Sequence, residues 1–307
     1  MSVTSEQQVL EQKRKVPSRL RNNEALTTLK ILGTSATGLV GLIITAAFVA
    51  TAIFSLLTSN ALLPYDPFGL NIPVALQPPS WTHWFGTDSL GRDILSRIIA
   101  AAPIDAEVAF VVVSIAVLLG VPLGSVAAFK GGIVEEIVMR VTDIFLAFPG
   151  LVLAIAIAIA LGAGVTNSIL ALAPVWWPSY VRLARGETLA LKSQDFVEAS
   201  KASGQKGRFI ILHHILPTIL PIILAYATLD IGSVLVTFSV LSFIGVGAQP
   251  PTPEWGLMAV QDELYFIKAP WVVIVPSIFI LLVAVGFSLL GDRLRDAFDP
   301  RTRSLFR

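Results

Sequence analysis

The sequence predicts an all-α, polytopic membrane protein with about six transmembrane helices. Hydrophobic residues make up 54% of the 307 positions, and charged residues only 14%. The charged residues are also spread unevenly, because four long runs contain none of them: 31–57, 108–129, 144–181 and 269–291. A helix needs about 20 apolar residues to cross the hydrocarbon layer. Lipid offers no partner to unpaired backbone groups, so several such runs indicate a bundle of spanning helices.

These runs divide into six spans. The run 144–181 is 38 residues long, and Gly162, Gly164 and Asn167 predict a tight turn inside it. In the segment 58–104, five prolines between positions 64 and 79 exclude a long regular helix over the first part. The spacing over 89–97 suits a short helix along the outer face. The six spans are predicted near 31–57, 105–129, 134–161, 166–187, 215–245 and 270–291.

The positions of Lys and Arg predict the orientation. With six spans both termini lie on one side, and that side would hold 19 of the 22 basic residues. Basic residues favour the cytoplasmic side, so both termini are predicted to be cytoplasmic in a multi-pass protein of the plasma or inner membrane. The resulting parts are cytoplasmic tails over 1–30 and 292–307, a first span at 31–57, an extracytoplasmic loop over 58–104, and a core of five spans over 105–291 with a cytoplasmic loop at 192–216.

The sequence lacks the residues that several classes of function require. The chain has no cysteine, its net charge is +1, and its three histidines (His83, His213 and His214) show no metal-ligand spacing. Lys192 follows leucine rather than the glycine that a phosphate-binding loop requires. We therefore expect no metal site, no nucleic-acid binding, no cofactor and no enzymatic activity. No cleavable signal peptide is expected, because the first apolar run is long and follows a polar, basic segment.

The loop at 192–216 carries the most informative pattern. Asp195 and Glu198 have the spacing of a capping box, which predicts a helix start. Small residues follow as far as Gly204, a natural helix stop. A short helix with so little side-chain bulk can lie in a groove of another protein. An ordinary helical cytoplasmic loop fits these residues equally well.

A family resemblance decides between the two readings. Glu198-Ala199-Ser200, then Gly204, then Leu216-Pro217 resembles the EAA loop of ABC importer permeases, although Ala is usual at Ser200. The His-Ile-Leu-Pro form is similar to the dipeptide/oligopeptide/nickel branch. Ala101–Phe110 departs from that branch's usual Gly-Ala-Arg run. Further segments resemble the branch over roughly residues 80–300: Phe85–Asp93, Asp143–Gly150, Gln249–Gly256 and Gly291–Asp296.

The resemblance implies a type I ABC importer permease, of the C type, that imports di- or oligopeptides by alternating access. Oligosaccharides or nickel chelates are the alternative cargo in this branch. The implied partners are a second homologous permease, two cytoplasmic subunits that bind ATP and Mg²⁺, and an extracytoplasmic substrate-binding protein. The residues that would couple the permease to the ATPase are Gln194, Asp195, Phe196, Glu198, Ala199, Ser200 and Gly204.

Polar and aromatic residues inside the spans are candidates for the translocation path. Asp230 lies deep in an apolar span, where a carboxylate is costly and suggests function. Trp177 and Tyr180 could form an aromatic wall. A hydrogen-bonded structural aspartate and ordinary helix packing explain the same residues. An ion-coupled secondary transporter would need paired intramembrane charges, of which Asp230 is the one clear case, and a membrane-embedded enzyme would need a catalytic constellation.

Overall fold

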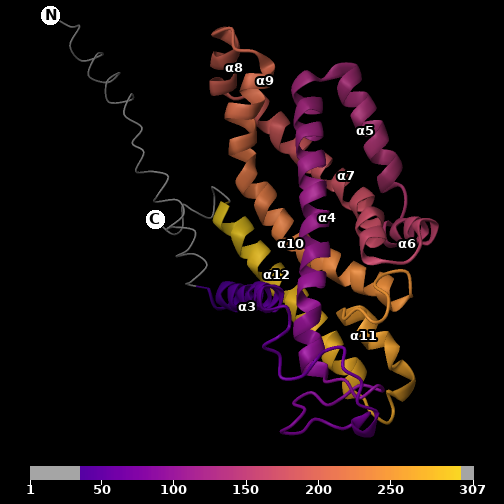
Figure 1. Cartoon of the computed structure of the whole chain (residues 1–307). Helices are drawn as coiled ribbons and strands as arrows, with labels where there is room; N and C mark the ends of the chain where they lie inside the picture. Colours follow the sequence, from indigo (N-terminus) through magenta and orange to yellow (C-terminus); the bar gives the residue numbers. More distant parts are fainter. Residues whose placement is uncertain (1–34, 299–307) are drawn as a thin grey trace, which may run out of the picture.

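The computed structural model describes residues 35–298 as a bundle of α-helices (Figure 1). Within this range there is no β-strand, only an isolated antiparallel bridge between Thr87 and Asp93. The predicted all-α fold is therefore confirmed. The predicted tail at 1–30 and the end of the C-terminal tail lie outside the described residues. In chain order the helices are α3 (Ala36–Thr58), η1 (Ile72–Val74), α4 (Ile94–Lys130), α5 (Gly132–Leu146), α6 (Gly150–Leu161), α7 (Val165–Lys192), α8 (Asp195–Ala202), α9 (Gly207–Ile210), η2 (Ile211–Ile215), α10 (Leu216–Phe243), α11 (Trp255–Gln261), η3 (Glu263–Tyr265) and α12 (Trp271–Phe298).

Four helical segments of the described part are long and apolar enough to cross a membrane: α3, α4, the segment 207–243, and α12. α5 and α6 are apolar enough only when taken together. α7 has 28 residues, but polar and charged side chains lower its hydropathy. Because α7 packs among α4, α6 and α10, much of its surface faces protein rather than lipid. The six predicted spans thus correspond to four long apolar helical segments, the bent pair of α5 and α6, and α7, which packs among the other helices.

The start of α4 differs from the prediction. One continuous helix of 37 residues replaces the predicted short outer helix at 89–97 and the span at 105–129. Asp93 caps it, because its carboxylate accepts a hydrogen bond from the Ser96 N–H at 2.8 Å. Pro103 and Pro122 lie inside the helix without ending it. The side-chain cap at Asp93, rather than the end of the charge-free run, sets where the helix begins.

The predicted span at 134–161 is not one continuous helix. It consists of α5 and α6, which meet at an angle of 84° across a break of three residues. Pro149 stands at the N-cap of α6. A proline disfavours helical backbone in the residue before it and has no N–H of its own, so the helix cannot run through this point.

The predicted turn after α6 is confirmed. Gly162 and Gly164 have φ angles of +89° and +141°, which side-chain-bearing residues rarely adopt. The side-chain amide of Asn167 donates to the carbonyl oxygens of Leu161 and Gly162 at 3.0 and 3.1 Å. These bonds satisfy carbonyl groups at the end of α6 and allow α7 to begin at Val165.

The fifth and sixth spans are longer than predicted. α9, the π-helical turn η2 and α10 run on from one another, so the apolar helical segment begins at residue 207 rather than 215. α12 continues to Phe298, past the predicted boundary at 291. Near its end Arg293 donates from Nε to Thr37 Oγ1 at 3.0 Å, which joins α12 to the start of α3. The first part of the predicted tail is therefore helix.

Small residues bring the helices close together. A Cβ atom added to Gly120 on α4 would lie 2.5 Å from the carbonyl oxygen of Trp177 on α7. A Cβ atom at Gly41 on α3 would lie 2.7 Å from the Leu290 nitrogen on α12, and one at Gly232 on α10 would lie 2.9 Å from the Ala284 carbonyl oxygen. Membrane helices use such positions to approach one another at backbone distance.

Figure 1 shows the two ends of the bundle. α8 and α9 lie at one end, beside the C-terminal end of α4 and the start of α5. The irregular segment before α4 lies at the opposite end, near α11 and the start of α12. α3 crosses the bundle and contacts α12 and α4.

Candidate functional site

The predicted helix in the cytoplasmic loop is present as α8, but its cap differs from the prediction. Gln194 is the N-cap residue and makes no side-chain capping bond, so Asp195 and Glu198 do not form a capping box. The Gln194 carbonyl oxygen accepts from the N–H groups of Val197 and Glu198 at 2.9 and 3.2 Å. The two acidic side chains still lie in the first turn, where negative charge favours a helix.

Gly204 ends α8 as predicted. Its φ angle is +76°, and its N–H donates to the Lys201 carbonyl oxygen at 2.9 Å. The next N–H, of Gln205, reaches back to the Ser200 carbonyl oxygen at 3.2 Å. A Cβ atom on Gly204 would meet nothing within 4 Å. The glycine is therefore needed for its backbone conformation, while the space around it is open.

The predicted coupling residues form an exposed surface. Ser200 is half-buried, and its hydroxyl donates to the Phe196 carbonyl oxygen at 2.8 Å. Phe196 keeps 39% of its surface exposed. Val197 alone among the α8 residues is buried and anchors the helix. The exposed members of the predicted set are Gln194, Asp195, Phe196, Glu198, Ala199 and Gly204.

α8 is attached to the end of α4. The Lys201 ammonium lies 5.6 Å from the centre of the Phe129 ring, and the Lys192 ammonium donates to the Ala128 carbonyl oxygen at 2.9 Å. Beyond Gly204, a Cβ atom on Gly207 would lie 2.7 Å from the Phe129 ring. Lys201 therefore joins α8 to the C-terminal end of α4, while Lys192 on α7 and Gly207 on α9 join the neighbouring segments to the same end.

The predicted path residues are only partly brought together. Asp230 on α10 is half-buried and neighbours Tyr180 and Trp176 of α7, although the buried Tyr180 hydroxyl has no hydrogen-bond partner among the described residues. Trp177 instead packs edge-on against Phe145 on α5, with ring centroids 5.4 Å apart. Trp176 is thus the aromatic neighbour of Asp230.

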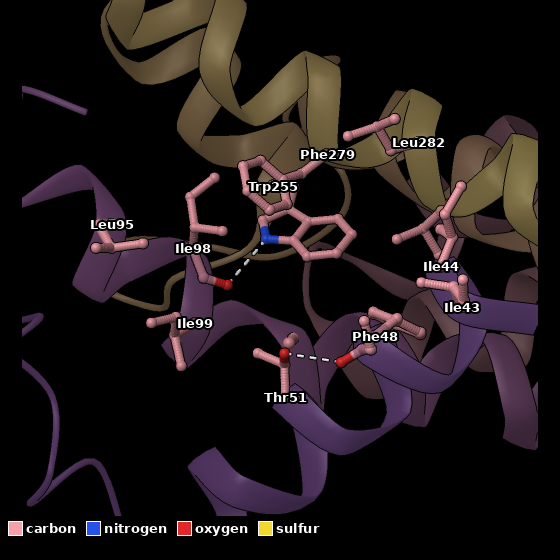
Figure 2. A pocket seen from close by; sticks show the side chains of 13 residues that line it. Ile43, Ile44, Phe48, Thr51, Leu95, Ile98, Ile99, Trp255, Phe279 and Leu282 are labelled. Atoms are coloured by element: carbon pink, nitrogen blue, oxygen red, sulfur yellow. Dashed lines mark hydrogen bonds between the residues drawn. The ribbon is translucent and has the colours of Figure 1, made fainter. Parts of the chain in front are cut away.

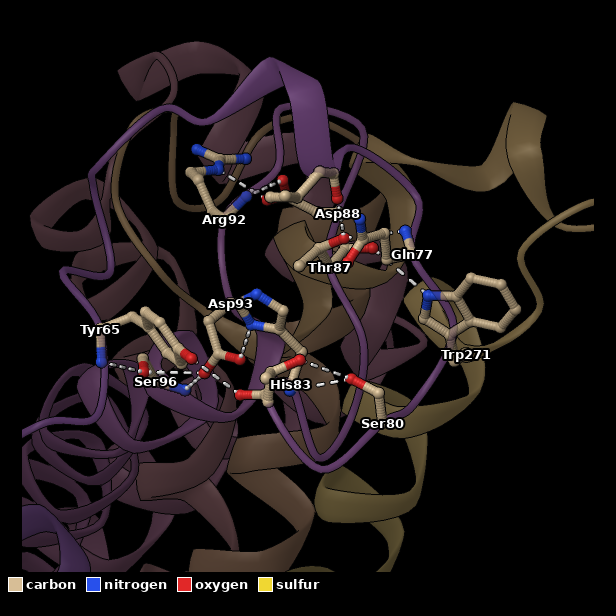
Figure 3. A network of polar contacts seen from close by, with 12 residues as sticks. Tyr65, Gln77, Ser80, His83, Thr87, Asp88, Arg92, Asp93, Ser96 and Trp271 are labelled. Carbon is tan, nitrogen blue, oxygen red and sulfur yellow. Dashed lines mark hydrogen bonds and ion pairs between the residues drawn. The ribbon is translucent and has the colours of Figure 1, made fainter.

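A buried charge network organises the motif at 85–93 (Figure 3). Asp88 accepts from the backbone N–H groups of Leu90 and Arg92, both at 2.9 Å. Its Oδ2 also lies 2.6 Å from Arg92 Nε and 3.8 Å from Arg97 Nε. Both arginines are buried and share the single negative charge of Asp88, and Arg97 is also stabilised by Asp262. Sequence reasoning matched this motif to the family but assigned no role to the arginines.

The same loop is tied to the spans. Asp93, which caps α4, lies 2.9 Å from His83 Nδ1 (Figure 3). The Trp271 indole at the start of α12 donates to the Thr87 carbonyl oxygen at 3.3 Å. Gly91 has a φ of +73°, and a Cβ atom there would overlap the Asn71 carbonyl oxygen. The motif at 85–93 therefore joins the start of α4 to the start of α12.

α11 is packed into this end of the bundle beside an apolar pocket of about 400 Å³ (Figure 2). The Trp255 indole N–H donates to the Ile98 carbonyl oxygen at 3.1 Å, and its ring packs against Phe48 and Phe279. The only hydroxyl in the pocket wall, on Thr51, donates to the Ala47 carbonyl oxygen. With no free polar group to orient a solute, this pocket is not a candidate for the path.

Metal ligands do not gather in the described part of the chain. Between residues 35 and 298 there is no group of three or more His, Asp or Glu side chains that could hold a metal ion. The histidines have other neighbours: His213 stacks on Phe209 at 4.1 Å, and His83 contacts Asp93. The expectation of no metal site stays a prediction.

Comparison with known proteins decides the family. Residues 120–304 match the family described as binding-protein-dependent transport system inner membrane component. The chain belongs to this family. It is 42% identical over 267 residues to the dipeptide transport system permease protein DppC of Alkalihalophilus pseudofirmus, across 87% of this chain and 86% of that protein.

Two further relatives extend the set. The chain is 41% identical to the probable D,D-dipeptide transport system permease protein DdpC of Escherichia coli, across 83% of this chain and 86% of that protein. It is 42% identical to a glutathione transport system permease protein, GsiD, of Escherichia coli, across 73% of this chain and 74% of that protein. The family membership confirms the predicted ABC importer permease.

The fold agrees with a solved transporter. A chain of the MetNI methionine ABC transporter in an inward-facing conformation aligns with a TM-score of 0.55 and 18% identity, across 67% of this chain and 98% of that chain. At this identity the likeness shows the fold alone. The importer permease fold is therefore confirmed independently of the sequence motifs.

Proposed function

We propose that this permease carries di- or oligopeptides and is driven through α8 by separate ATPase subunits. The observation that carries the proposal is the exposed surface of α8, which is anchored by the buried Val197 and by the contact of Lys201 with Phe129 at the end of α4. The peptide cargo rests on the relatives, two of which are named for dipeptides and one for glutathione, itself a peptide. Oligosaccharides or nickel chelates remain the alternative cargo.

The proposed assembly contains more than this chain. A second homologous permease would share the path, and two cytoplasmic subunits would bind ATP and Mg²⁺ and hydrolyse the nucleotide. This chain would supply no cofactor site and no catalytic residue. An extracytoplasmic binding protein would deliver the solute to outer segments near 80–97 and 249–265. The wide separation of α8 from these segments supports the assignment of opposite membrane faces (Figure 1).

The proposed orientation follows the basic residues. α8 lies on the side predicted to hold 19 of the 22 Lys and Arg residues, so that side would face the cytoplasm with both termini. The C-type assignment rests on the same arrangement, with one extra N-terminal span and an outer loop before the matched core.

The coupling step follows from the attachments of α8. When the ATPases close, α8 would move with them, and the contacts on Phe129 would carry the movement into α4. α4 is about 55 Å long at about 1.5 Å per residue, and it packs along α7 at backbone distance. A rigid pair of this length would transmit the displacement to the outer end.

Tyr180, Asp230 and Trp177 are retained as proposed path residues. The position of Asp230 supports a role in the path, since this residue is half-buried and lies opposite aromatic side chains of α7. Its neighbour Trp176 joins this set, and Trp177 is the member with the weakest support, because it packs on Phe145.

Gly204 provides the test of coupling. Gly204→Ala and Gly204→Leu impose the same strain on a left-handed backbone, about 1–2 kcal/mol. They differ in bulk on a surface that is open here and would be covered by the ATPase. We expect Gly204→Leu to abolish uptake of a labelled dipeptide by the reconstituted complex, with the chain still in the membrane, and Gly204→Ala to retain part of it. Normal uptake by Gly204→Leu would refute the coupling role.

The partners are tested separately. The tagged chain is purified from its native membrane in a gentle detergent, and the proteins that accompany it are identified by mass spectrometry. We expect a second permease and two ATPase copies for each copy of this chain. Recovery of this chain alone, under conditions that preserve a known importer complex, would contradict the proposed assembly.

A further inference from the structure

Two carboxyl groups meet inside the outer end of the bundle, 149 positions apart in the sequence. Asp105 lies on α4, and Glu254 stands immediately before α11. Neither residue has any solvent exposure. Asp105 Oδ2 lies 3.4 Å from the backbone nitrogen of Trp255, the residue that follows Glu254, so the two carboxyl groups are close neighbours. Two buried carboxylates side by side repel each other, so both cannot easily be ionised at once.

Glu254 has the surroundings of the ionised partner. Its two carboxylate oxygens accept from the backbone N–H groups of Gly256 and Leu257 at 2.8 and 2.7 Å, which caps α11. The Ser242 hydroxyl of α10 also faces it. Burial raises the pKa of Glu254 above its ordinary value, and the two backbone N–H groups oppose that rise. These donors stabilise negative charge on this carboxyl group rather than on its neighbour.

Asp105 has the surroundings of the protonated partner. Its Oδ2 accepts a long bond, 3.4 Å, from the Trp255 N–H. Its Oδ1 is fully buried and has no hydrogen-bond partner among the described residues. An unpaired buried carboxylate oxygen is costly, whereas a protonated one is a donor. A proton on Oδ1 would give this atom a partner in Glu254.

No cation on the surrounding elements neutralises the pair. The one charged neighbour of Asp105 in the described structure is Glu254. On α4, Arg97 turns to Asp88 and Asp262 of the outer network, where Arg92 also pairs with Asp88. α3 and residues 271–291 of α12 contain no titratable side chain, and α10 contributes the uncharged Ser242.

We propose that Asp105 and Glu254 form a proton-binding site, in which the two carboxyl groups share one proton and thereby hold α11 against α4. The proton stays on Oδ1 of Asp105, and the protonated carboxyl group donates a hydrogen bond to the Glu254 carboxylate. The site joins the N-cap of α11 to the first third of the spanning helix α4. The inference concerns the folded chain by itself and does not depend on the transport assignment.

α11 is the element that the proton secures. Its residues from Trp255 to Ala259 are all buried, and Gly256 lies against the backbone of Ser239 on α10. Trp255 fills the space between α4, α3 and α12 (Figure 2). Loss of the proton would leave two negative charges where α11 meets α4. The contact would weaken there first, because the other contacts between α11 and α4, such as the Trp255 indole bond to the Ile98 carbonyl oxygen and the Arg97 bond to Gln261, involve no charge repulsion.

The sign of the pH dependence follows from proton binding. The folded state keeps a proton that unfolded carboxyl groups release near pH 4. The stabilisation by the shared proton is therefore fully present below that pH and is lost as the pH rises to the value at which the folded pair releases it. Across this window the unfolding equilibrium constant should increase by up to about tenfold per pH unit.

Asp105→Asn tests the site, because its amide can donate to Glu254 at every pH but cannot release a proton. In the purified full chain in detergent, we expect the wild type to lose stability across the window and Asp105→Asn to lose this dependence. The infrared carbonyl band of a protonated carboxyl group should be present in the wild type at neutral pH and absent in Asp105→Asn. Glu263→Gln, which removes an exposed carboxyl group beside α11, should behave as the wild type.

Hydrogen exchange locates the effect. Relative to Asp105→Asn at the same pH, the wild-type amides of 255–261 should lose protection as the pH rises, while those of α7 should not. The absence of a protonated-carboxyl band in the wild type at neutral pH would overturn the proposal, even if Asp105→Asn failed to fold. So would equal pH profiles of the two proteins. Stabilisation of the wild type, but not of Asp105→Asn, by sodium chloride over choline chloride would instead assign the pair to a metal ion.

Discussion

At Gly120, α4 approaches the backbone of α7 so closely that an added methyl group should destabilise the protein. A Cβ atom on Gly120 would lie 2.5 Å from the Trp177 carbonyl oxygen and 2.6 Å from Tyr180 Cβ, where an ordinary contact begins at 3.4 Å. Gly120→Ala therefore requires the two helices to separate by about 0.9 Å, an overpacking that costs about 1–3 kcal/mol. Because the obstructing atoms include rigid helix backbone, side-chain rotation cannot relieve the overlap.

Gly186 provides the matched control. It also lies in a helix, on α7, but a Cβ atom there would meet nothing within 4 Å. Gly→Ala raises helix propensity by about 1 kcal/mol at both positions, so the difference between the two variants isolates the overpacking. One kcal/mol shifts the midpoint of a chain of this size by about 2–4 °C.

Thermal unfolding of both purified variants in the same detergent measures the difference. We expect the midpoint of Gly120→Ala to fall several degrees below that of Gly186→Ala. Equal midpoints would show that α4 and α7 do not approach at backbone distance, and would remove the rigid pair from the proposed coupling step.

Two further substitutions address the outer end. Asp88→Asn keeps the shape of the side chain but leaves Arg92 and Arg97 without their shared carboxylate, and should destabilise the chain by about 3–5 kcal/mol in denaturant titrations; Glu136→Gln, in an exposed pair with Arg140, should change stability by less than about 1 kcal/mol. Trp255→Phe removes a buried indole hydrogen bond and should cost about 1–3 kcal/mol, with faster hydrogen exchange in α11. A loss for Asp88→Asn no larger than for Glu136→Gln, or unchanged exchange in Trp255→Phe, would contradict these assignments.

Features set by local chemistry could be predicted from the sequence. Charge-free runs identify spanning helices because lipid excludes charge and unpaired backbone over about 20 residues. The turn at Gly162 and Gly164 and the stop at Gly204 are predictable because positive φ angles favour glycine. The exposed surface of α8 and the family were also accessible, since they rest on a short contiguous motif and on spacing along one chain.

Features that depend on contacts between residues far apart in the sequence could be found only in the tertiary structure. The start of α4 is set by a side-chain cap inside a loop network, and not by hydropathy. Trp176 rather than Trp177 faces Asp230, because the rotation of α7 is fixed by its packing on α4 and α10. Asp105 and Glu254 are an unremarkable pair of acids in the sequence. They become a site only where helix packing removes water and leaves one buried oxygen without a donor, since charge and burial act together through space.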